Sequence, residues 1–147
     1  MRAMLDTNII VDALQDREPW AEAAKQIFRE AAMGRFSGCI TAKACADIHD
    51  LVHRCTHSEA EARNTLGKLF TLFELLDTTA ADCQRALISE TKDFEDAIMI
   101  ETARREGLDC IVTRNARDFS HAPLKVIEPE AFLKTLNVTV QSTRELT

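Results

Sequence analysis

Short apolar runs alternate with amphipathic, helix-like segments along most of this chain. The apolar runs predict strands at residues 1–5, 38–40, 74–76, 109–113 and 125–127. Between them apolar residues recur at helical spacing, and the predicted helices begin near Thr7, Pro19, Thr41, Ser58, Thr79, Phe94 and Pro129. This alternation is typical of a three-layer α/β/α fold with a central, doubly wound parallel sheet of about four or five strands.

Local signals support several of these boundaries. Thr41 and Ser58 are candidate N-caps, because their hydroxyls can accept hydrogen bonds from the free N–H groups of a first helical turn. Pro19 suits a first turn, where its missing N–H is not needed. Gly34 and Gly107 are placed to close the helices that precede them.

Length and composition indicate one domain. The chain has 147 residues, 46% of them hydrophobic, which suits a single core over residues 1–136. Residues 137–147 are polar and read as a mobile C-terminal tail. No stretch resembles a targeting peptide or approaches a membrane span of about 18 apolar residues. We therefore expect a soluble, cytoplasmic protein.

Cysteine content and charge narrow the function. The five cysteines form no CxxC pair and are odd in number, which argues against a zinc ribbon and against a disulfide framework. A formal charge of −6 argues against indiscriminate adhesion to nucleic acid, although it permits a local basic rim around an acidic centre.

Four carboxylates interrupt or follow apolar elements, and they suggest one gathered acidic pocket. Asp6 ends the first strand, where ligands bind in open α/β sheets. Asp47 and Asp96 lie on apolar helix stripes, and Asp118 follows the strand at 109–113. A buried, isolated carboxylate costs several kcal/mol or becomes protonated, so Asp47 and Asp96 each need a cation or a donor.

Structural roles compete with this interpretation. Asp6 could be only the N-cap of the first helix, and Asp93 could be the N-cap of the helix that carries Asp96. The apolar residues that recur at helical spacing near residue 70 could belong to the core or to a dimer interface; they are Leu66, Leu69, Phe70 and Phe73.

The arrangement of these residues resembles the PIN domains, compact metal-dependent nucleases, over about residues 3–134. The resemblance rests on Leu5-Asp6-Thr7-Asn8, on Thr41 followed six residues later by Asp47, on Asp96-Ala97 and on Thr113-Arg114-Asn115. Two positions depart from the usual pattern. Asp47 stands where Glu is more frequent, and Asn115 stands where Asp is expected; either Asn115 or Asp118 completes the acidic set.

The resemblance implies a PIN-like fold and a ribonuclease. Asp6, Asp47 and Asp96 would be the metal ligands, and these together with Asp118 the catalytic residues. Oxygen ligands without His or Cys favour Mg²⁺ or Mn²⁺ over Zn²⁺. The side chains expected to hold the ligand shell through hydrogen bonds are Thr7, Asn8, Thr113 and Asn115. The reaction would be hydrolysis of an RNA phosphodiester by metal-activated water.

Basic residues near these motifs are candidates for contacts to the substrate: Lys43, Arg114 and Arg117 first, then His53, Arg54, His57 and His121. The chain has one Trp and no Tyr, so base stacking is not expected to dominate. Small stand-alone PIN proteins often serve as the toxin of a type II toxin–antitoxin pair. By that resemblance we expect an RNA substrate, a homodimer and a small antitoxin.

Other doubly wound acidic folds fit less well. A receiver domain wants paired acids after the first strand, and a haloacid-dehalogenase-like phosphatase wants Asp-x-Asp there, whereas this chain has Asp6-Thr7-Asn8. The remaining alternative is a non-catalytic PIN-like module that binds RNA or a protein.

Overall fold

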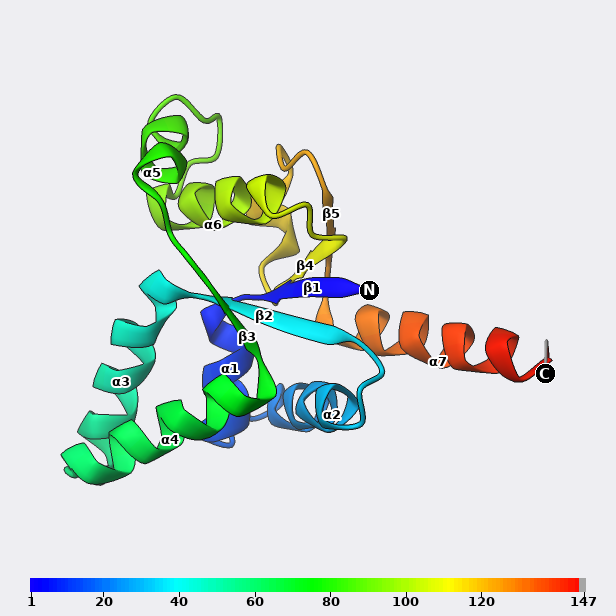
Figure 1. Cartoon of the computed structure of the whole chain (residues 1–147), viewed down its shortest axis with the longest axis horizontal. Helices are drawn as coiled ribbons and strands as arrows, with labels where there is room; N and C mark the ends of the chain where they lie inside the picture. Colours follow the sequence, from blue (N-terminus) through cyan, green and yellow to red (C-terminus); the bar gives the residue numbers. More distant parts are fainter. Residues whose placement is uncertain (146–147) are drawn as a thin grey trace.

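A computed structural model describes the backbone of residues 1–145 and the side chains of residues 1–137. Its centre is a five-stranded sheet in which every neighbouring pair is parallel, in the order β3-β2-β1-β4-β5 (Figure 1). The strands are β1 (Arg2–Leu5), β2 (Ser37–Thr41), β3 (Glu74–Leu76), β4 (Cys110–Val112) and β5 (Lys125–Ile127). The predicted parallel sheet is confirmed, and all five predicted strands are present.

Helices cover both faces of this sheet, as a three-layer fold requires (Figure 1). One layer holds α5 (Ala80–Ala86) and α6 (Phe94–Arg105). The other holds α1 (Thr7–Leu14), α2 (Ala21–Ala32), α3 (Ala42–Thr56), α4 (Glu59–Leu72) and α7 (Pro129–Glu145). A short 3₁₀ helix, η1 (Ala116–Phe119), follows β4 and was not expected from the sequence.

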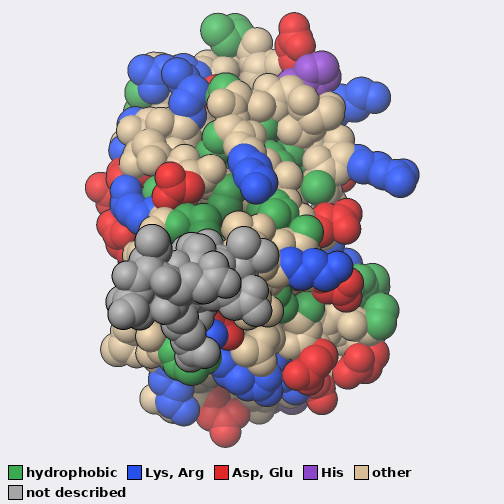
Figure 2. All heavy atoms as spheres, turned by 90° about the vertical axis from the view of Figure 1, so that its right-hand side faces the viewer, with side chains coloured by type: hydrophobic (Ala, Val, Ile, Leu, Met, Phe, Trp, Pro, Cys, Tyr) green, Lys and Arg blue, Asp and Glu red, His purple; other side chains and the backbone are tan. Residues whose placement is uncertain are grey.

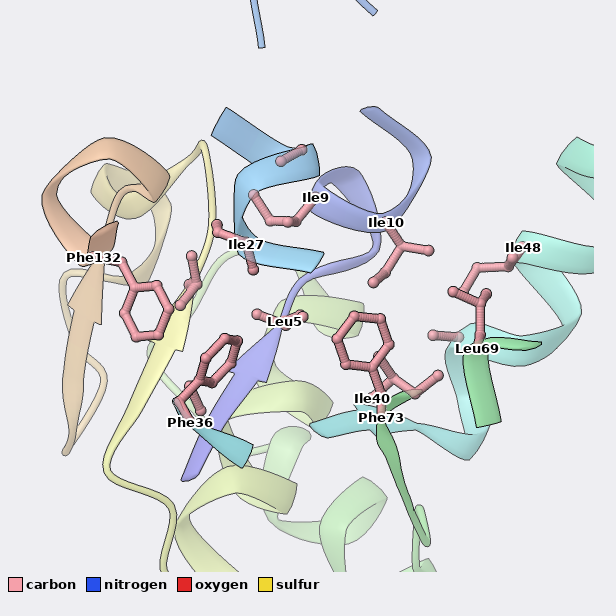
Figure 3. Packing of buried hydrophobic residues seen from close by; sticks show 14 of the residues in the cluster. Leu5, Ile9, Ile10, Ile27, Phe36, Ile40, Ile48, Leu69, Phe73 and Phe132 are labelled. Carbon is pink, nitrogen blue, oxygen red and sulfur yellow. The ribbon is translucent and has the colours of Figure 1, made fainter. Parts of the chain in front are cut away.

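The strand period divides the core into two parts. Ala3 and Leu5 of β1 face the layer of α1 to α4 and α7, whereas Met4 between them faces α6. Figure 3 shows the larger part, in which side chains from the sheet and several helices converge on Leu5. Leu69 and Phe73 are buried there, while Phe70 is 42% exposed. The stripe on α4 therefore contributes mainly to the core.

Local capping follows the sequence signals. The Thr41 hydroxyl accepts a hydrogen bond from the Ala44 N–H at 3.2 Å, and the Ser58 hydroxyl accepts one from the Glu61 N–H at 3.1 Å. Gly107, with φ +66°, follows the end of α6 in the left-handed conformation that glycine adopts without strain. These caps explain why α3, α4 and α6 have nearly their predicted bounds.

Two helix bounds differ from the prediction. Pro19 does not open α2: the Trp20 N–H donates to the Arg17 carbonyl at 3.0 Å in a turn, and the helix begins at Ala21. The last helix continues past residue 136 to Glu145, since residues 137–145 contain neither Gly nor Pro to end it. Residues 146–147 and the side chains from residue 138 lie outside the described part, so the mobility of the 137–147 tail stays a prediction.

No helix within the described residues is long and apolar enough to span a membrane. Figure 2 shows the side of the molecule where the N-terminus lies, with the amino ends of the strands. Its described side chains of both charges are interspersed with apolar and neutral atoms. Carboxylates gather instead at the opposite edge of the sheet, at the carboxyl ends of the strands.

Candidate functional site

A pocket of about 150 Å³ lies where β1 and β2 end and where α6 begins. The strands are parallel and neighbouring, so their carboxyl ends bring the residues that follow them to one edge of the sheet. The polar residues that line the pocket are Asp6, Thr7, Thr41, Lys43, Asp47, Glu95 and Asp96. Three of the four acids expected in one pocket therefore line the same pocket.

Asp6 stands in the N-cap position of α1, but its side chain makes no capping hydrogen bond. Its carboxylate is buried, with 8% of the residue exposed, and accepts a hydrogen bond from the Thr113 hydroxyl at 2.7 Å. Burial raises the pKa of Asp6 above its usual value, although the Thr113 hydrogen bond and the positive charge of Arg114 act to lower it. The structure thus gives the Asp6 carboxylate a hydrogen-bond partner across the sheet, the Thr113 hydroxyl.

Thr113 links several predicted site residues. It is fully buried, and its hydroxyl accepts hydrogen bonds from the Asn115 N–H at 3.1 Å and from the Asn8 side-chain amide at 3.5 Å. The Asn8 Oδ1 atom is buried and has no hydrogen-bond partner among the described residues. A chain of polar groups therefore fixes the Asp6 carboxylate and leaves one buried acceptor open.

Asp96 lies in the first turn of α6 and is half-buried. Its N–H donates to the Asp93 carboxylate at 3.0 Å, which confirms Asp93 as the N-cap. Burial raises the pKa of Asp96 to about 7, and the negative charges of Asp93, Asp6, Asp118 and Glu95 add to the shift. Burial and the neighbouring carboxylates thus disfavour a negative charge on Asp96.

Asp47 differs from the expectation of a buried carboxylate on an apolar stripe. Its side chain is 50% exposed, and its Oδ2 atom lies 3.1 Å from the Lys43 ammonium. Lys43 also contacts Glu95 at 3.0 Å, so it bridges α3 and α6 across the pocket. Burial alone would lower the pKa of Lys43, but the hydrogen bonds to Glu95 and Asp47 raise it overall. Sequence reasoning missed Glu95, whose only signal was its position next to Asp96.

Asp118 and Asn115 are both exposed. Asp118 lies on η1 and lines a neighbouring cleft instead of the acidic pocket, yet its charge contributes to the raised pKa of Asp96. Asn115 contributes a backbone N–H to Thr113. Of the two candidates for the last acidic position, Asp118 is therefore the one whose charge acts on Asp96.

The predicted basic contacts separate into different environments. The Arg114 guanidinium lies 2.6 Å from the fully buried Asp12 carboxylate and stacks over Trp20 at 3.9 Å from the ring centre. Its charge still acts on Asp6. The candidates His53, Arg54 and His57 occupy the last turn of α3 and the residue after it, roughly 17 Å along the axis from its first turn. They lie outside the pocket, whereas Arg117 borders the neighbouring cleft.

The donors at this site fit a hard divalent cation. Asp6 and Asp96 offer carboxylate oxygens in the pocket. Asn8 does not line it, but its buried Oδ1 atom, next to Thr113, has no hydrogen-bond partner in the described part. No group of three His, Cys, Asp or Glu side chains in that part is already arranged around a metal position. The carboxylate of Asp47, the third acid that lines the pocket, contacts the Lys43 ammonium instead.

Comparison with known sequences places this chain. A profile of the PIN domain matches residues 2–117. The chain belongs to the PIN domain family. No curated protein matches it. PIN domains are generally nucleases that use a divalent metal, and the acidic pocket lies within the matched residues.

Solved structures share the PIN fold over most of the chain. A chain of a toxin–antitoxin complex from Klebsiella pneumoniae is 26% identical, covers 86% of this chain and 97% of its own, and has a TM-score of 0.63. A chain of VapBC-1 from nontypeable Haemophilus influenzae is 15% identical, covers 88% of this chain and 99% of its own, and has a TM-score of 0.64. VapC20 of Mycobacterium tuberculosis, a toxin that cleaves the sarcin–ricin loop, is 15% identical. It covers 74% of this chain and 86% of its own, with a TM-score of 0.58.

Proposed function

We propose that this PIN domain is a metal-dependent endoribonuclease that hydrolyses RNA phosphodiester bonds, and that it is the toxin of a type II toxin–antitoxin pair. The observation that carries the proposal is the pairing of Asp6 and Asp96 in one pocket, where burial and neighbouring carboxylates raise the pKa of Asp96 to about 7. Such concentrated negative charge favours a bound cation.

Asp6 and Asp96 would hold the ion, with Asp47 as a further ligand or water-positioning base and with Asp118 or Asn115 completing the set. When bound, Mg²⁺ or Mn²⁺ lowers the pKa of water and neutralises charge on the phosphate oxygens. Thr113 orients the Asp6 carboxylate through its hydrogen bond of 2.7 Å. Thr7 lines the same pocket, and Asn8 is positioned through Thr113.

The proposed partners follow from the relatives. Several similar structures are complexes of toxin–antitoxin type, three similar structures are bound to DNA, and one is a toxin that cleaves the sarcin–ricin loop. We infer an RNA substrate, a homodimer and a small antitoxin that blocks the acidic pocket, with action in the cytoplasm. An antitoxin would restrain a nuclease whose acidic pocket is open to solvent at Asp47 and Glu95.

The first test is cleavage of a mixed RNA pool with Mg²⁺ or Mn²⁺ by the wild type, by Asp6→Asn and by the wild type with EDTA. We expect cleavage only with both the metal and Asp6. Asp50→Asn is the matched control, because Asp50 is an exposed acid of α3 outside the pocket. A folded wild type that neither cleaves RNA nor binds metal would instead support the non-catalytic binding module.

Lys43 provides a separate prediction about metal binding. Replacing it by Ala removes a positive charge that Asp47 and Glu95 now share. We expect Mn²⁺ to bind roughly tenfold more tightly, because a +1 and a +2 charge roughly 6 Å apart repel by about 1.4 kcal/mol in a water-like dielectric. Calorimetric titration measures the affinity directly.

The control for this prediction is Lys68→Ala, which removes an exposed lysine of α4 and changes the net charge equally. Unchanged or weaker Mn²⁺ binding by Lys43→Ala would mean that Lys43 does not compete with the ion for these carboxylates.

A further inference from the structure

A second cleft, of about 480 Å³, lies beside the acidic pocket. One wall is the segment that joins α5 to α6, with Glu90, Lys92 and Asp93. The opposite wall is η1 and the residues after it, with Arg117 and His121. The cleft falls within the usual volume range of small-molecule sites, roughly 300–1,000 Å³, so it has room for a nucleotide.

The cleft and the acidic pocket meet at the start of α6. Asp93 lines the cleft, and its carboxylate accepts the hydrogen bond from the N–H of Asp96, which lines the pocket, at 3.0 Å. Asp118 also lines the cleft, and its charge acts on Asp96. A polymer whose reacting group is held at Asp96 would therefore extend directly into this cleft.

The cations of the cleft are available to a ligand. Lys92 and Arg117 are exposed, and neither has an ion-pair or hydrogen-bond partner within the described part of the chain. By contrast, Lys43 is shared by two carboxylates and Arg114 is paired with buried Asp12. Two unpaired cations beside an acidic pocket match the charge of a phosphodiester next to the reacting one.

Three acids, Glu90, Asp93 and Asp118, also line the cleft, and two of them already have partners in the protein. Glu90 lies 3.2 Å from the His121 ring, and Asp93 caps α6. Asp118 is exposed and adds a negative charge to the cleft. Lys92 and Arg117 are the groups of the cleft that can attract the phosphate of a strand leaving the pocket.

The lining also indicates how a strand would be held. Among the described residues, the His121 imidazole is the only aromatic ring that lines the cleft, so these residues form no stacking platform for bases. Contacts to phosphate oxygens position a nucleic acid without reading its sequence. A ligand held here through Lys92 and Arg117 would be recognised by its backbone.

We propose that the cleft between Lys92 and Arg117 binds the backbone phosphate adjacent to the scissile phosphate of a single RNA strand. This inference rests on the proposed ribonuclease function. The two cations hold the strand so that the neighbouring phosphodiester lies at Asp6 and Asp96, and they act through substrate binding.

The test is binding of a labelled RNA decanucleotide, by fluorescence anisotropy, to Asp96→Asn protein with and without the pair of changes Lys92→Ala and Arg117→Ala. We expect the pair to weaken binding about tenfold and to reduce the slope of log K against log salt by about 0.7, the contribution of one single-strand phosphate contact. A dinucleotide, which has only the scissile phosphate, should bind both proteins equally.

The matched control is Lys68→Ala with Lys134→Ala, two exposed lysines of α4 and α7 that lie outside the cleft. It changes the net charge equally and should leave the affinity within about twofold. Unchanged melting temperatures would show that neither pair acts through the fold.

Cleavage assays separate this inference from the proposed function. If otherwise wild-type protein cleaves RNA and the Lys92 and Arg117 changes alter neither affinity nor KM, the cleft inference is overturned and the nuclease stands. If wild-type protein does not cleave RNA but its binding depends on both residues, the cleft stands and the nuclease proposal falls. Equal losses in the control pair would show only general charge attraction and overturn the inference.

Discussion

Asp96→Asn should lower RNA cleavage by on the order of 10³-fold while making the metal-free protein more stable at pH 8. The loss of activity follows from the proposed role of Asp96 as a metal ligand, because an amide is a weaker ligand than a carboxylate. The gain in stability follows from its surroundings, since burial and then the charges of Asp93, Asp6, Asp118 and Glu95 disfavour a negative charge there.

The direction of the stability change depends on pH. The pKa of Asp96 is raised from 3.8 to about 7 in the folded protein. Between these values the folded state binds more protons than the unfolded state, so this group's contribution to stability falls as pH rises. We expect Asp96→Asn to gain about 1–2 kcal/mol at pH 8, or about 3–6 °C in melting temperature, and nothing near pH 4.

Thermal melts of the metal-free proteins at several pH values, together with a cleavage assay, measure both effects. Asp50→Asn removes an exposed acid outside the pocket and should change neither quantity. An Asp96→Asn protein that cleaves RNA normally would contradict the role of Asp96 as a metal ligand. A stability difference between wild type and Asp96→Asn that does not vary with pH would contradict the raised pKa of Asp96.

Asp82→Ala should destabilise the fold by about 3–5 kcal/mol, because it removes the buried carboxylate that Arg105, Thr79 and Thr102 share and leaves Arg105 with Glu106 as its carboxylate partner. Asp82 is fully buried on α5, and Arg105 on α6 contacts both of its carboxylate oxygens, at 3.0 and 3.1 Å. The same carboxylate accepts hydrogen bonds from the Thr79 N–H and the Thr102 hydroxyl, both at 3.0 Å.

This network positions the helix that carries Asp96. Arg105, in the last turn of α6, also donates to the Asp77 carbonyl at 2.9 Å, so the end of α6 is tied to the segment before α5. Loss of Asp82 should therefore loosen the packing of α6 against α5, and the protein should unfold at a lower denaturant concentration.

Urea denaturation at pH 7 measures the loss, and Asp77→Ala is the control because only the Asp77 backbone carbonyl is used by Arg105. A loss for Asp82→Ala below about 1 kcal/mol would mean that the network does not stabilise α6. Burial alone would raise the pKa of Asp82, but the hydrogen bonds from Arg105, Thr79 and Thr102 outweigh it and hold the pKa at about 2. The contribution of the Asp82 carboxylate to stability is present above pH 4 and is lost as pH falls from about 4 to 2.

Much of the fold was predictable because its signals are local. The Thr41 and Ser58 caps and the Gly107 closure act on N–H and C=O groups within a few residues of themselves. The start of α2 was predicted wrongly, since the turn of Arg17 to Trp20 competes with the first-turn preference of Pro19. The 3₁₀ helix η1 was missed because one short turn has no periodic pattern to detect.

The sequence predicted which residues line the candidate site better than it predicted how they are arranged. Asp6 and Asp96 line the same pocket as predicted, because parallel strands and the helices after them present their ends at one edge. The apolar neighbours of Asp47 indicated burial, whereas its side chain is exposed and contacts Lys43. That pairing depends on the distance between α3 and α6, which neither helix encodes alone.

The sequence by itself determined the family, the order of strands and helices, and which acids stand at their ends, because these depend on local periodicity, caps and motif spacing. Only the tertiary structure decided which charges face one another. It joined Thr113 to Asp6, placed Arg114 against Asp12, and brought Lys92 and Arg117 to one cleft. Coulomb energies depend on distance through space, and residues far apart in the chain acquire that distance only when the layers pack.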